Sequence, residues 1–442
     1  MLTGNQYRES IRDARESYFQ GNLVEDATSH SLFGPSVNWV AKTYDRYFTP
    51  AAGAHNPMYD VPTTAAELRQ EMDMLLGADP TASSTAGCMA LRGVAGKLSA
   101  INSAYRSRLE AFLDRCRDRD LRVAVAQQDL GHFRVVGRTA DGITVSGGKQ
   151  HVVGGALVHE LMVVPGGPVA EGQVERAVAF AIPVNAPGIT LISTTTQPRA
   201  HDDRHFPYSR DHSIPDSLAA FENVFVPNDR IFLDGETASA AMFSETLGTW
   251  ERALWTAMQA DQAEILLGVA RTVAEMNGVA DASHIREKLA AMAVYARLCR
   301  SGLDSALANA KTNEAGMVVP DDSYIYATRA YGVTNYSDVA GWVHDIGGAL
   351  ILTAPSIGDY ENEATHMYIE KYMSTGATVR GEDRLRVFHL IRDLTADAYS
   401  GWAKLNNQMI GGGLYAQRMA ALDNYPIEAA QDKANRAAHI KD

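Results

Sequence analysis

Apolar residues in the first 121 positions recur at the three-to-four-residue spacing of amphipathic helices. Between residues 99 and 117 they fall on one stripe. The stripe consists of Ile101, Ala104, Leu109, Phe112 and Leu113. Thr64 and Glu67 are spaced as a capping box, in which each side chain satisfies a free backbone amide at a helix start. The pattern predicts an N-terminal helical domain over residues 1–121.

The pattern changes to an alternation of period two between residues 122 and 235. In 133–146, Asp141 and Gly142 supply the positive φ angles of a tight turn between two alternating stretches. Other short stretches, separated by glycine and proline, are 122–127, 161–164, 177–183, 189–192 and 224–226. Short strands without intervening helices are typical of an antiparallel barrel or sandwich. We expect a β-barrel domain over 122–235.

Helical spacing returns from residue 236 to the end of the chain. A stripe between 257 and 276 ends at Asn277 and Gly278, and it contains Ile265, Leu266, Val269, Val273 and Met276. Further helices are predicted at 283–310, 327–352 and 382–405. Long helices with short connections indicate an antiparallel bundle over 236–442. Helices, then strands, then helices is the order of an α+β protein.

Composition and charge narrow the class of protein. The chain has 442 residues, 46% of them hydrophobic, and a net charge of −13, which argues against nucleic acids and anionic membranes as partners. The first residues lack a secretory pattern, and no apolar run reaches the roughly 18 residues of a membrane helix. Cys88, Cys116 and Cys299 show no disulfide or paired metal spacing. We therefore expect a cytoplasmic protein.

The common sequence motifs of catalysis are missing. There is no Gly-x-Gly-x-x-Gly between a strand and a helix, no phosphate loop, no His-Glu-x-x-His and no Gly-x-Ser-x-Gly. This favours an enzyme whose cofactor is held by scattered contacts.

The histidines leave several readings open. His132 is expected in a loop between two strands and His151 near the end of a hairpin, where either a structural or a catalytic role is open. A polar loop could also form a metal cluster, although its spacing does not match a helix face. Its candidate ligands are His201, Asp202, Asp203, His205, Asp211 and His212.

Residues 221–233, read as Phe-Glu-Asn-Val-Phe-Val-Pro-Asn-Asp-Arg-Ile-Phe-Leu, closely resemble a strand-end motif of one flavoprotein family. This is the 4-hydroxyphenylacetate 3-monooxygenase / 4-hydroxybutyryl-CoA dehydratase family, and the dehydratase branch is the more similar. Segments at 4–11, 141–149, 282–289, 345–356 and 411–418 resemble it in the same order. The resemblance implies an acyl-CoA-dehydrogenase-like fold and a homotetramer. It also implies FAD between barrel and bundle, with the adenine end reaching a neighbouring subunit.

The same resemblance implies which residues bind the flavin. His151 would lie along the edge of the isoalloxazine with the residues that follow it, and it is the candidate general base, because imidazole exchanges a proton near neutral pH. The implied cofactor-binding residues are Gln127, Gln128, Asp129, Val152, Val153, Gly154, Gly155, Gly411, Gly412, Gln417 and Arg418.

The chain departs from the family at positions that decide the reaction. The dehydratase holds an iron–sulfur cluster on three Cys and one His, whereas the matching positions here are Ser84, Cys88, Val294 and Ser301. Three of these are poor ligands for iron, so no metal site is expected, and Cys88 and Cys299 are expected to be buried apolar residues. The phenol-hydroxylating branch has an Arg and a Tyr where this chain has Gly87 and Leu91, and Val153 replaces a frequent Thr near flavin N5.

These departures leave three hypotheses. The leading one is a FAD-dependent monooxygenase or oxidase that uses O2 on a small-molecule substrate, with a CoA thioester or a biosynthetic intermediate as candidates and a flavin reductase as a partner. The second is an O2-independent acyl-CoA dehydrogenase or a dehydratase/isomerase. The third is a non-catalytic helical assembly protein that has lost the flavin.

Overall fold

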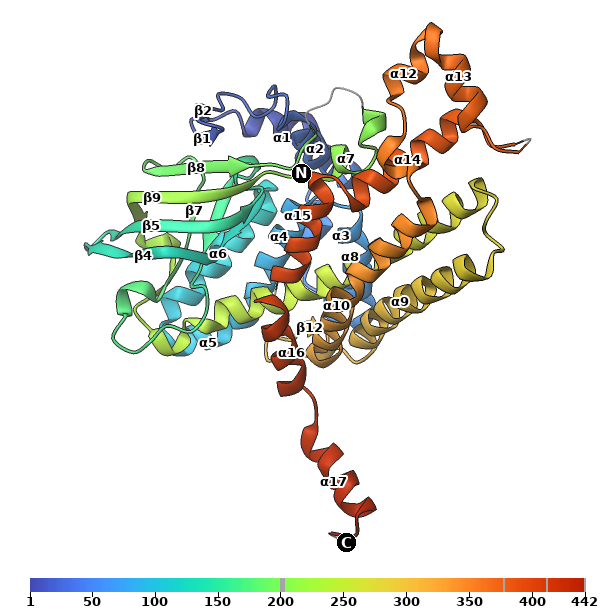
Figure 1. The fold of residues 1–442 in the computed structure, drawn as a ribbon. Coiled ribbons are helices and arrows are strands. Elements are labelled where there is room, and N and C mark those ends of the chain that lie inside the picture. Colours follow the sequence, from blue (N-terminus) through green and yellow to red (C-terminus); the bar gives the residue numbers. More distant parts are fainter. Residues whose placement is uncertain (199–202, 377, 411, 441–442) are drawn as a thin grey trace.

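The computed structural model describes residues 1–198, 203–376, 378–410 and 412–440. Helices, then strands, then helices follow one another along the chain (Figure 1). The N-terminal helices are α1 (Gly4–Ser10), α2 (Gly34–Tyr47), α3 (Ala65–Leu76), α4 (Pro80–Met89), α5 (Ala95–Ile101) and α6 (Ser103–Arg119). A hairpin of β1 (Glu16–Phe19) and β2 (Asn22–Leu23) lies between α1 and α2.

Side chains at the helix starts explain where these helices begin. Thr64 accepts a hydrogen bond from the Glu67 amide at the start of α3, Asp79 accepts from the Thr81 and Ala82 amides of α4, and Asn102 accepts from Ala104 of α6. Each bond satisfies an amide that has no partner within its helix. The Glu67 carboxylate reaches back to Thr63 rather than to Thr64, so the predicted capping box is displaced by one residue.

The middle of the chain forms two open sheets. Its strands are β3 (Val123–Ala126), β4 (Gln128–Arg138), β5 (Gly142–Val153), β6 (Glu160–Val163), β7 (Val178–Pro183), β8 (Ile189–Thr194), β9 (Asp216–Pro227) and β10 (Ile231–Asp234). One sheet has the order β2-β1-β8-β9-β5-β4 and the other β10-β7-β6-β3.

The predicted closed antiparallel barrel is not confirmed. Over the described residues no ladder joins the edges of the two sheets, and the pairs β1–β8 and β3–β6 run parallel. The two sheets are held together by side chains instead. Phe133 and Phe221 of the larger sheet meet Phe180 of the smaller one, with ring centroids 6.3 and 6.5 Å apart.

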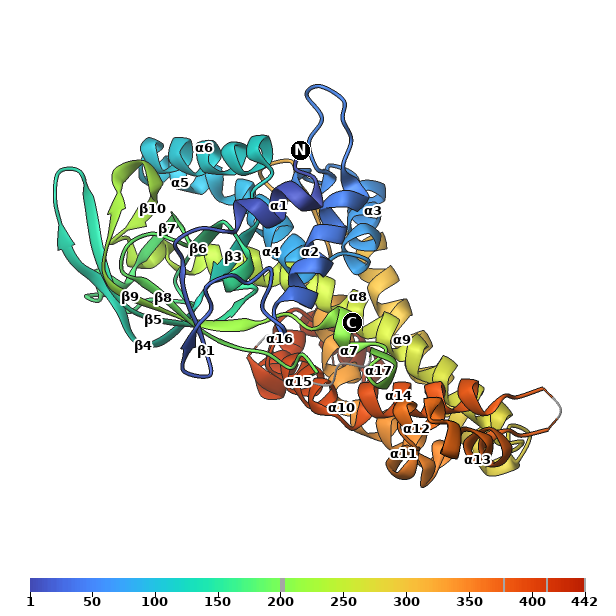
Figure 2. The same ribbon diagram turned by 90° about the horizontal axis from the view of Figure 1, so that it is seen from above.

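The last part of the chain is helical apart from the short hairpin of β11 (Lys311–Thr312) and β12 (Val318–Val319). The long helices are α8 (Ala241–Met276), α9 (Ser283–Ala308) and α10 (Asp322–Gly347), which pack against one another (Figure 2). The others are α11 (Leu350–Thr353), α12 (Ile357–Glu361), α13 (Glu363–Met373), α14 (Gly381–Thr395), α15 (Ala398–Met409), α16 (Gly413–Asp423) and α17 (Ile427–Ala437). The short helix α7 (Ser209–His212) lies earlier, between β8 and β9.

The bundle confirms most of the predicted helices and corrects two. The predicted helix at 382–405 is two helices, α14 and α15, which meet at Ala396 and Asp397. The helix predicted at 327–352 ends at Gly347, because Gly348 takes a positive φ of 71° that closes the helix. Among the described residues, no helix combines the length and the apolarity needed to cross a bilayer.

The C-terminal end leaves the body of the molecule. In Figure 1 α17 projects away from the other helices, and none of its side chains is buried. Exposed large apolar residues continue along this end of the chain, among them Leu405, Met409, Tyr415, Leu422 and Ile427.

Glu71 of α3 gives the fold a testable dependence on pH. Its side chain is buried, Oε1 has no hydrogen-bond partner among the described residues, and burial, aided by Asp60, raises the pKa of its carboxyl group from 4.5 to about 9. The folded chain therefore keeps a proton that the unfolded chain loses above pH 4.5. The free energy of unfolding consequently falls as pH rises from 4.5 towards 9.

We expect Glu71→Gln to remove that pH dependence. The variant should gain stability over the parent as pH rises from 4.5 to 9, by at most about 1.4 kcal/mol per pH unit. Denaturant unfolding at several pH values measures this gain. Asp73→Asn, on the exposed side of the same helix, is the control, and equal slopes for the two variants would contradict the prediction.

Candidate active site

The end of β5 carries an irregularity that aims His151 out of the sheet. Against β9, Lys149 pairs with Ala219 and Val152 with Ser217, so β5 has one extra residue at this point. His151 has a φ of 57°, which non-glycine residues rarely adopt, and its side chain is 67% exposed. A bulge next to an active site commonly redirects a side chain in this way.

His151 has a carboxylate partner on the neighbouring strand. Its Nδ1 lies 3.4 Å from Oδ2 of Asp216, the first residue of β9. The Asp216 hydrogen bond raises the pKa of His151 above 6.5, against the opposing effect of desolvation, and the charge of Glu251 in α8 adds to the rise. The second oxygen of Asp216, Oδ1, is buried and has no partner among the described residues. The pair can therefore hold a proton near neutral pH and has an acceptor left for a ligand.

Helix α4 lies directly against this strand end. Gly154 has a φ of 69°, and a Cβ added to it would lie 2.4 Å from Thr81 Cγ2 of α4. The Gly154 amide donates to the Pro215 carbonyl at 2.8 Å. Glycine at this position is therefore required by the approach of α4.

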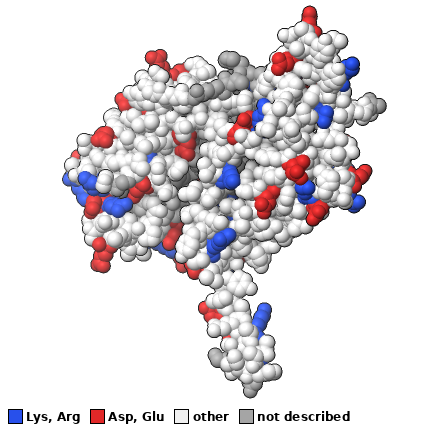
Figure 3. All heavy atoms as spheres, viewed as in Figure 1, with Lys and Arg blue, Asp and Glu red and all other residues white. Residues whose placement is uncertain are grey.

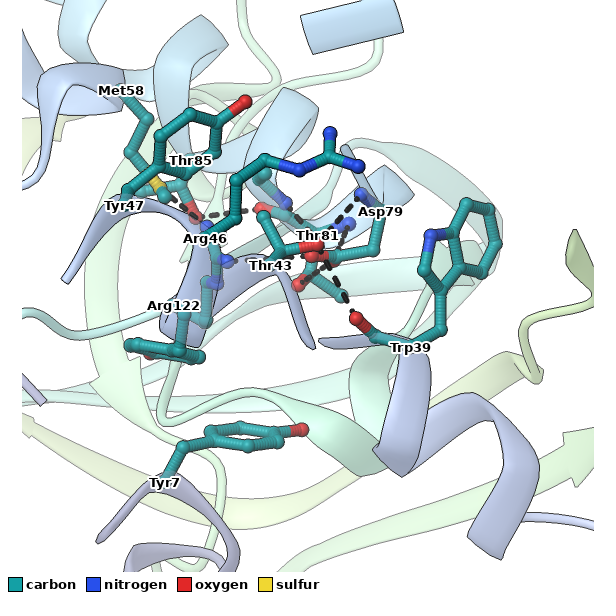
Figure 4. A network of polar contacts seen from close by, with 12 residues as sticks. Tyr7, Trp39, Thr43, Arg46, Tyr47, Met58, Asp79, Thr81, Thr85 and Arg122 are labelled. Carbon is teal, nitrogen blue, oxygen red and sulfur yellow. Dashed lines mark hydrogen bonds and ion pairs between the residues drawn. The ribbon is translucent and has the colours of Figure 1, made fainter. Parts of the chain in front are cut away.

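A buried ion pair fixes the start of α4 (Figure 4). The side chains of Asp79 and Arg122 are both fully buried, and Arg122 Nη2 lies 3.3 Å from Asp79 Oδ2. Asp79 also accepts from the amides of Thr81 and Ala82 and from the Thr81 hydroxyl. Arg122 lies 4.5 Å from the ring centroid of Tyr44. Burial alone would lower the pKa of Arg122, but the combined effect of Asp79, Tyr44, Tyr59 and Asp120 outweighs it and raises the pKa above its ordinary value.

The predicted flavin-binding residues Gln127, Gln128 and Asp129 differ in whether their side chains already have partners in the protein. Asp129 forms ion pairs with Lys149, whose side chain is buried, and with Arg176, so its carboxylate has a structural role. Lys149 also donates to the backbone carbonyls of Gln127 and Val164, at 3.1 and 2.7 Å. The amide side chains of Gln127 and Gln128 form no hydrogen bond to described residues, so they are the members of this segment open to a ligand.

The residues after His151 are mostly packed against protein. Val152 is fully buried, and Val153, which is partly buried, pairs with Asp216 in the β5–β9 ladder. A Cβ on Gly155 would lie 3.0 Å from Val152 Cγ1. At this strand end, His151 is thus the predicted residue whose side chain is open to solvent.

The predicted C-terminal residues lie elsewhere in the same chain. Gly412 has a φ of 88° and starts α16, which packs on α10 (Figures 1 and 2). Gln417 is buried and donates to the carbonyls of Gln408 and Ile410, whereas Arg418 is exposed and reaches Thr334. Gly411 lies outside the described residues. One chain therefore does not bring α16 together with the end of β5.

The positions matched to cluster ligands face different environments. Cys88 of α4 and Cys299 of α9 are fully buried, which confirms the expectation for both cysteines. Val294 is 57% exposed and Ser301 is exposed, so α9 turns these positions outwards and Cys299 inwards. In the described part of the chain, no three His, Cys, Asp or Glu residues lie close enough together to hold a metal ion.

The loop proposed as an alternative metal cluster has other contacts. His205 Nε2 accepts from the Ile357 amide, and His212 stacks on Tyr208 with centroids 4.1 Å apart. His201 and Asp202 lie outside the described residues. His132 lies within β4 rather than in the predicted loop.

Gly87, where the resemblance expects an Arg, contacts a tryptophan. A Cβ on Gly87 would lie 3.0 Å from Trp250 Cδ1 of α8. Trp250 and Leu91 are both buried, and Trp250 Nε1 has no hydrogen-bond partner among the described residues. Packed side chains thus occupy the space that an Arg or Tyr would need.

Sequence reasoning missed the carboxylate partner of His151. Asp216 belongs to no motif, and it reaches His151 because β5 and β9 pair although they are far apart in the sequence. Asp79 and Arg122 were missed for the same reason, although a lone Asp before Pro80 is a recognisable helix start.

Charges on the face shown in Figure 3 are interspersed, with Lys and Arg beside Asp and Glu. A nucleic-acid surface would gather basic side chains on one face.

Acyl-CoA dehydrogenases are among the proteins with a similar fold. The chain is similar to the structure of butyryl-CoA dehydrogenase from Megasphaera elsdenii, with a TM-score of 0.50 and 15% identity over 81% of each chain. It is more similar to the oxygenase component of 4-hydroxyphenylacetate 3-monooxygenase complexed with FAD. That match has a TM-score of 0.88 and 23% identity over 99% of this chain and 98% of the other.

Two family models identify the family of the chain. Residues 3–233 match the N-terminal model of 4-hydroxyphenylacetate 3-hydroxylase, and residues 240–439 match its C-terminal model. The chain belongs to this family, which confirms the resemblance seen in the sequence.

Two relatives represent the two branches. The chain is 27% identical to a 4-hydroxyphenylacetate 3-monooxygenase oxygenase component of Geobacillus sp. (strain PA-9), over 96% of this chain and 94% of the relative. It is 25% identical to 4-hydroxybutyryl-CoA dehydratase/vinylacetyl-CoA-Delta-isomerase of Clostridium aminobutyricum, over the full length of both.

Proposed function

We propose that the chain is a FAD-dependent oxygenase, the oxygenase component of a monooxygenase that receives reduced FAD from a separate flavin reductase. Family membership over nearly the whole chain supports this, since several similar relatives are named as oxygenase components. The observation that carries the proposal is the His151–Asp216 pair at the end of β5, which lies where the resemblance implies the flavin edge.

The residues at this strand end fit a flavin. Gln127 and Gln128 offer free amide groups, Asp216 offers an unpaired buried oxygen, and His151 offers an exposed ring with a raised pKa. Reduced FAD, when bound, supplies the electrons that activate O2. The chain's own residues would position the substrate, exclude water from the site and exchange a proton through His151.

The contact of Gly87 with Trp250 supports a substrate other than a simple phenolic acid. Truncation at residue 87 removes the cation that would bind a phenolate, and the indole of Trp250 occupies that space. We infer a neutral group at the reacting end of the substrate, such as a thioester of CoA or a carrier-bound biosynthetic intermediate.

We further propose that the chain acts as a homotetramer of three-part subunits, divided at 1–121, 122–235 and 236–442. Exposed apolar residues on α15 and α16 and the projecting α17 offer a surface for a second copy. In such an assembly Gly411, Gly412 and Arg418 of one chain would meet the nucleotide end of FAD on another, which supports a site completed by the partner.

Titration of the purified chain with FAD, followed by the visible spectrum and by gel filtration, tests this function. We expect flavin absorbance to co-elute with the protein, and chemically reduced FAD to bind as well. Protein that stays colourless at every FAD concentration would contradict the proposal and favour a non-catalytic assembly protein. A broad brown absorbance without added flavin would instead indicate an iron–sulfur protein.

The second candidate is O2-independent chemistry on an acyl-CoA. The full-length similarity to the dehydratase/isomerase relative favours it. Conversion of an acyl-CoA under strictly anaerobic conditions would support it over the oxygenase.

A further inference from the structure

A surface cavity lies between the segment that leads into α7 and helix α14. Its volume is about 260 Å³, and the residues that line it are Arg204, Phe206, Pro207, Arg210, Asp211 and Arg386. In Figures 1 and 2, α7 lies beside α14. Three arginines in the lining stand against one aspartate, so the cavity is positively charged and favours an anion.

The orientation of α14 towards this segment is set by Asp393. Asp393 is fully buried, and its Oδ2 accepts hydrogen bonds from the amides of Tyr208 and Ser209 at 2.9 and 2.8 Å. Arg386 precedes Asp393 by seven residues, which is about two helical turns, so both side chains project from the same face of α14. The buried carboxylate therefore holds residues 206–210 on the side of α14 that presents Arg386.

A pair of histidines fixes the neighbouring part of the same wall. The rings of His205 and His389 have centroids 4.7 Å apart, and His205 Nε2 accepts a hydrogen bond from the Ile357 amide. His389 follows Arg386 by three residues, so it lies on the same face of α14. Packed contacts on both sides therefore determine the shape of the cavity.

Carboxylates at the surface already contact two of the arginines. Arg204 Nη2 lies 2.6 Å from Glu361 Oε1. Nε and Nη2 of Arg386 both reach Glu382 Oε1, whereas its Nη1 forms no hydrogen bond to a described residue. Ion pairs exposed to solvent contribute little to stability, because water and salt screen them. A doubly charged ligand in the cavity can therefore compete with these carboxylates.

The volume and the charge together indicate the kind of ligand. Pockets that enclose a whole drug-sized molecule have about 300–1,000 Å³, so a cavity of about 260 Å³ fits one end group of a longer molecule. The planar fork of arginine matches the oxygens of phosphate, and a phosphate monoester has close to two negative charges near neutral pH. Phe206 adds an aromatic wall for the group that carries the phosphate.

The cavity lies within reach of the candidate active site. Asp216, the partner of His151, follows Arg210 by six residues, which span at most about 22 Å when fully extended. Ile214, between them, lies against the end of β5, since its Cδ1 is 3.3 Å from the position of a Cβ on Gly154. An elongated substrate can therefore have its phosphate in the cavity and its reacting end beside His151.

We propose that this cavity is a phosphate-monoester subsite, in which Arg204, Arg210 and Arg386 bind the phosphate-bearing end of the substrate. The inference rests on the proposed oxygenase function, because it assigns the cavity to the substrate of that reaction. Of the two substrate classes named above, CoA ends in a ribose 3′-phosphate monoester, whereas a carrier-bound intermediate has only a phosphodiester. FAD also lacks a monoester, so the subsite selects a CoA thioester.

The test measures by calorimetry how the purified full chain binds CoA and dephospho-CoA, which lacks the 3′-phosphate. The variants are Arg386→Gln, Arg386→Lys and the control Arg380→Gln, which removes an exposed arginine at the start of α14 that does not line the cavity. We expect Arg386→Gln to weaken CoA binding about 10- to 100-fold, because one charge-assisted contact is lost. Dephospho-CoA should bind the parent more weakly than CoA does, and it should bind the parent and Arg386→Gln equally.

The remaining arms separate the possible sources of phosphate. Arg386→Lys keeps the charge without the fork and should lose less affinity, and Arg380→Gln should match the parent. Inorganic phosphate should compete with CoA in the parent, and FAD affinity should be the same in all variants.

An equal effect of Arg386→Gln on CoA and on dephospho-CoA would overturn the inference. Inorganic phosphate that binds the parent and is not displaced by CoA would also overturn it, because the cavity would then hold a free ion. A parent that binds FAD but not CoA would overturn the inference and leave the oxygenase function standing. Failure of the parent to bind FAD would instead overturn the proposed function.

Discussion

Asp79→Ala should destabilise the chain by about 3–5 kcal/mol, because it leaves the Arg122 guanidinium buried without its carboxylate. The loss is large since both side chains are fully buried and since Asp79 also caps α4. Chemical denaturation of the apoprotein, followed by circular dichroism, measures the change. The variant also removes the anchor that holds α4 against Gly154, so FAD affinity should fall with stability.

A control variant separates the contribution of the buried ion pair to stability from that of helix capping. Thr64→Ala removes the exposed cap of α3 and should cost about 0.5–2 kcal/mol. The double variant Asp79→Ala/Arg122→Met should recover part of the loss, since it no longer buries an unpaired charge. If Asp79→Ala lowers the free energy of unfolding no more than Thr64→Ala does, the buried ion pair stabilises the fold no more than an exposed helix cap, which contradicts the prediction.

His151→Ala should reduce oxygen-dependent turnover about 10²–10⁴-fold while the fold and the FAD affinity are retained. The side chain is exposed, so its removal leaves no cavity in the core. Turnover is measured as oxygen consumption with reduced FAD, and the unfolding transition of the variant is the control. Parental turnover in His151→Ala would exclude His151 as the base.

The role of His151 as a base also predicts the direction in which the pH dependence of turnover shifts. Asp216 raises the pKa of His151, and a base works only when it is deprotonated, so the parental acid limb should lie above pH 6.5. Asp216→Asn removes the carboxylate charge and should shift that limb to lower pH. A limb that stays in place in Asp216→Asn would show that another group titrates there.

The hydrophobic pattern predicted the order of the elements because both periodicities reflect local burial. The stripe at 257–276 lies within α8, and the Asp141–Gly142 turn joins β4 to β5. The predicted closed barrel is not confirmed, because closure depends on which strands pair. The parallel pair β1–β8 brings together segments that are about 170 residues apart, so no local pattern records it.

Only those residues of the candidate site that lie in one local segment of the sequence could be predicted. His151 follows from its place at the end of a strand, but Asp216 comes from β9 and meets it through the pairing of distant strands. Asp129 and Gly154 stay predicted cofactor-binding residues, and the structure adds that Asp129 pairs with Lys149 and Arg176 and that Gly154 packs against Thr81. Residue type alone cannot distinguish a ligand contact from a packing requirement.

The positions at which the chain departs from its relatives now have structural explanations. Gly87 and Leu91 belong to a packed core that includes Trp250, so restoring an Arg at residue 87 would also require Trp250 to move. Val294 and Ser301 face outwards on α9, while the buried thiol of Cys299 contacts Gln259. The differences therefore concern the substrate region as much as the cluster.

Rapid mixing of the protein–reduced-FAD complex with oxygenated buffer tests the central claim most directly. The account predicts that flavin reoxidation on the protein differs in rate from that of free reduced FAD, depends on O2 concentration and changes in His151→Ala. Reoxidation identical to that of free reduced FAD at every protein concentration would contradict an O2-using flavoenzyme.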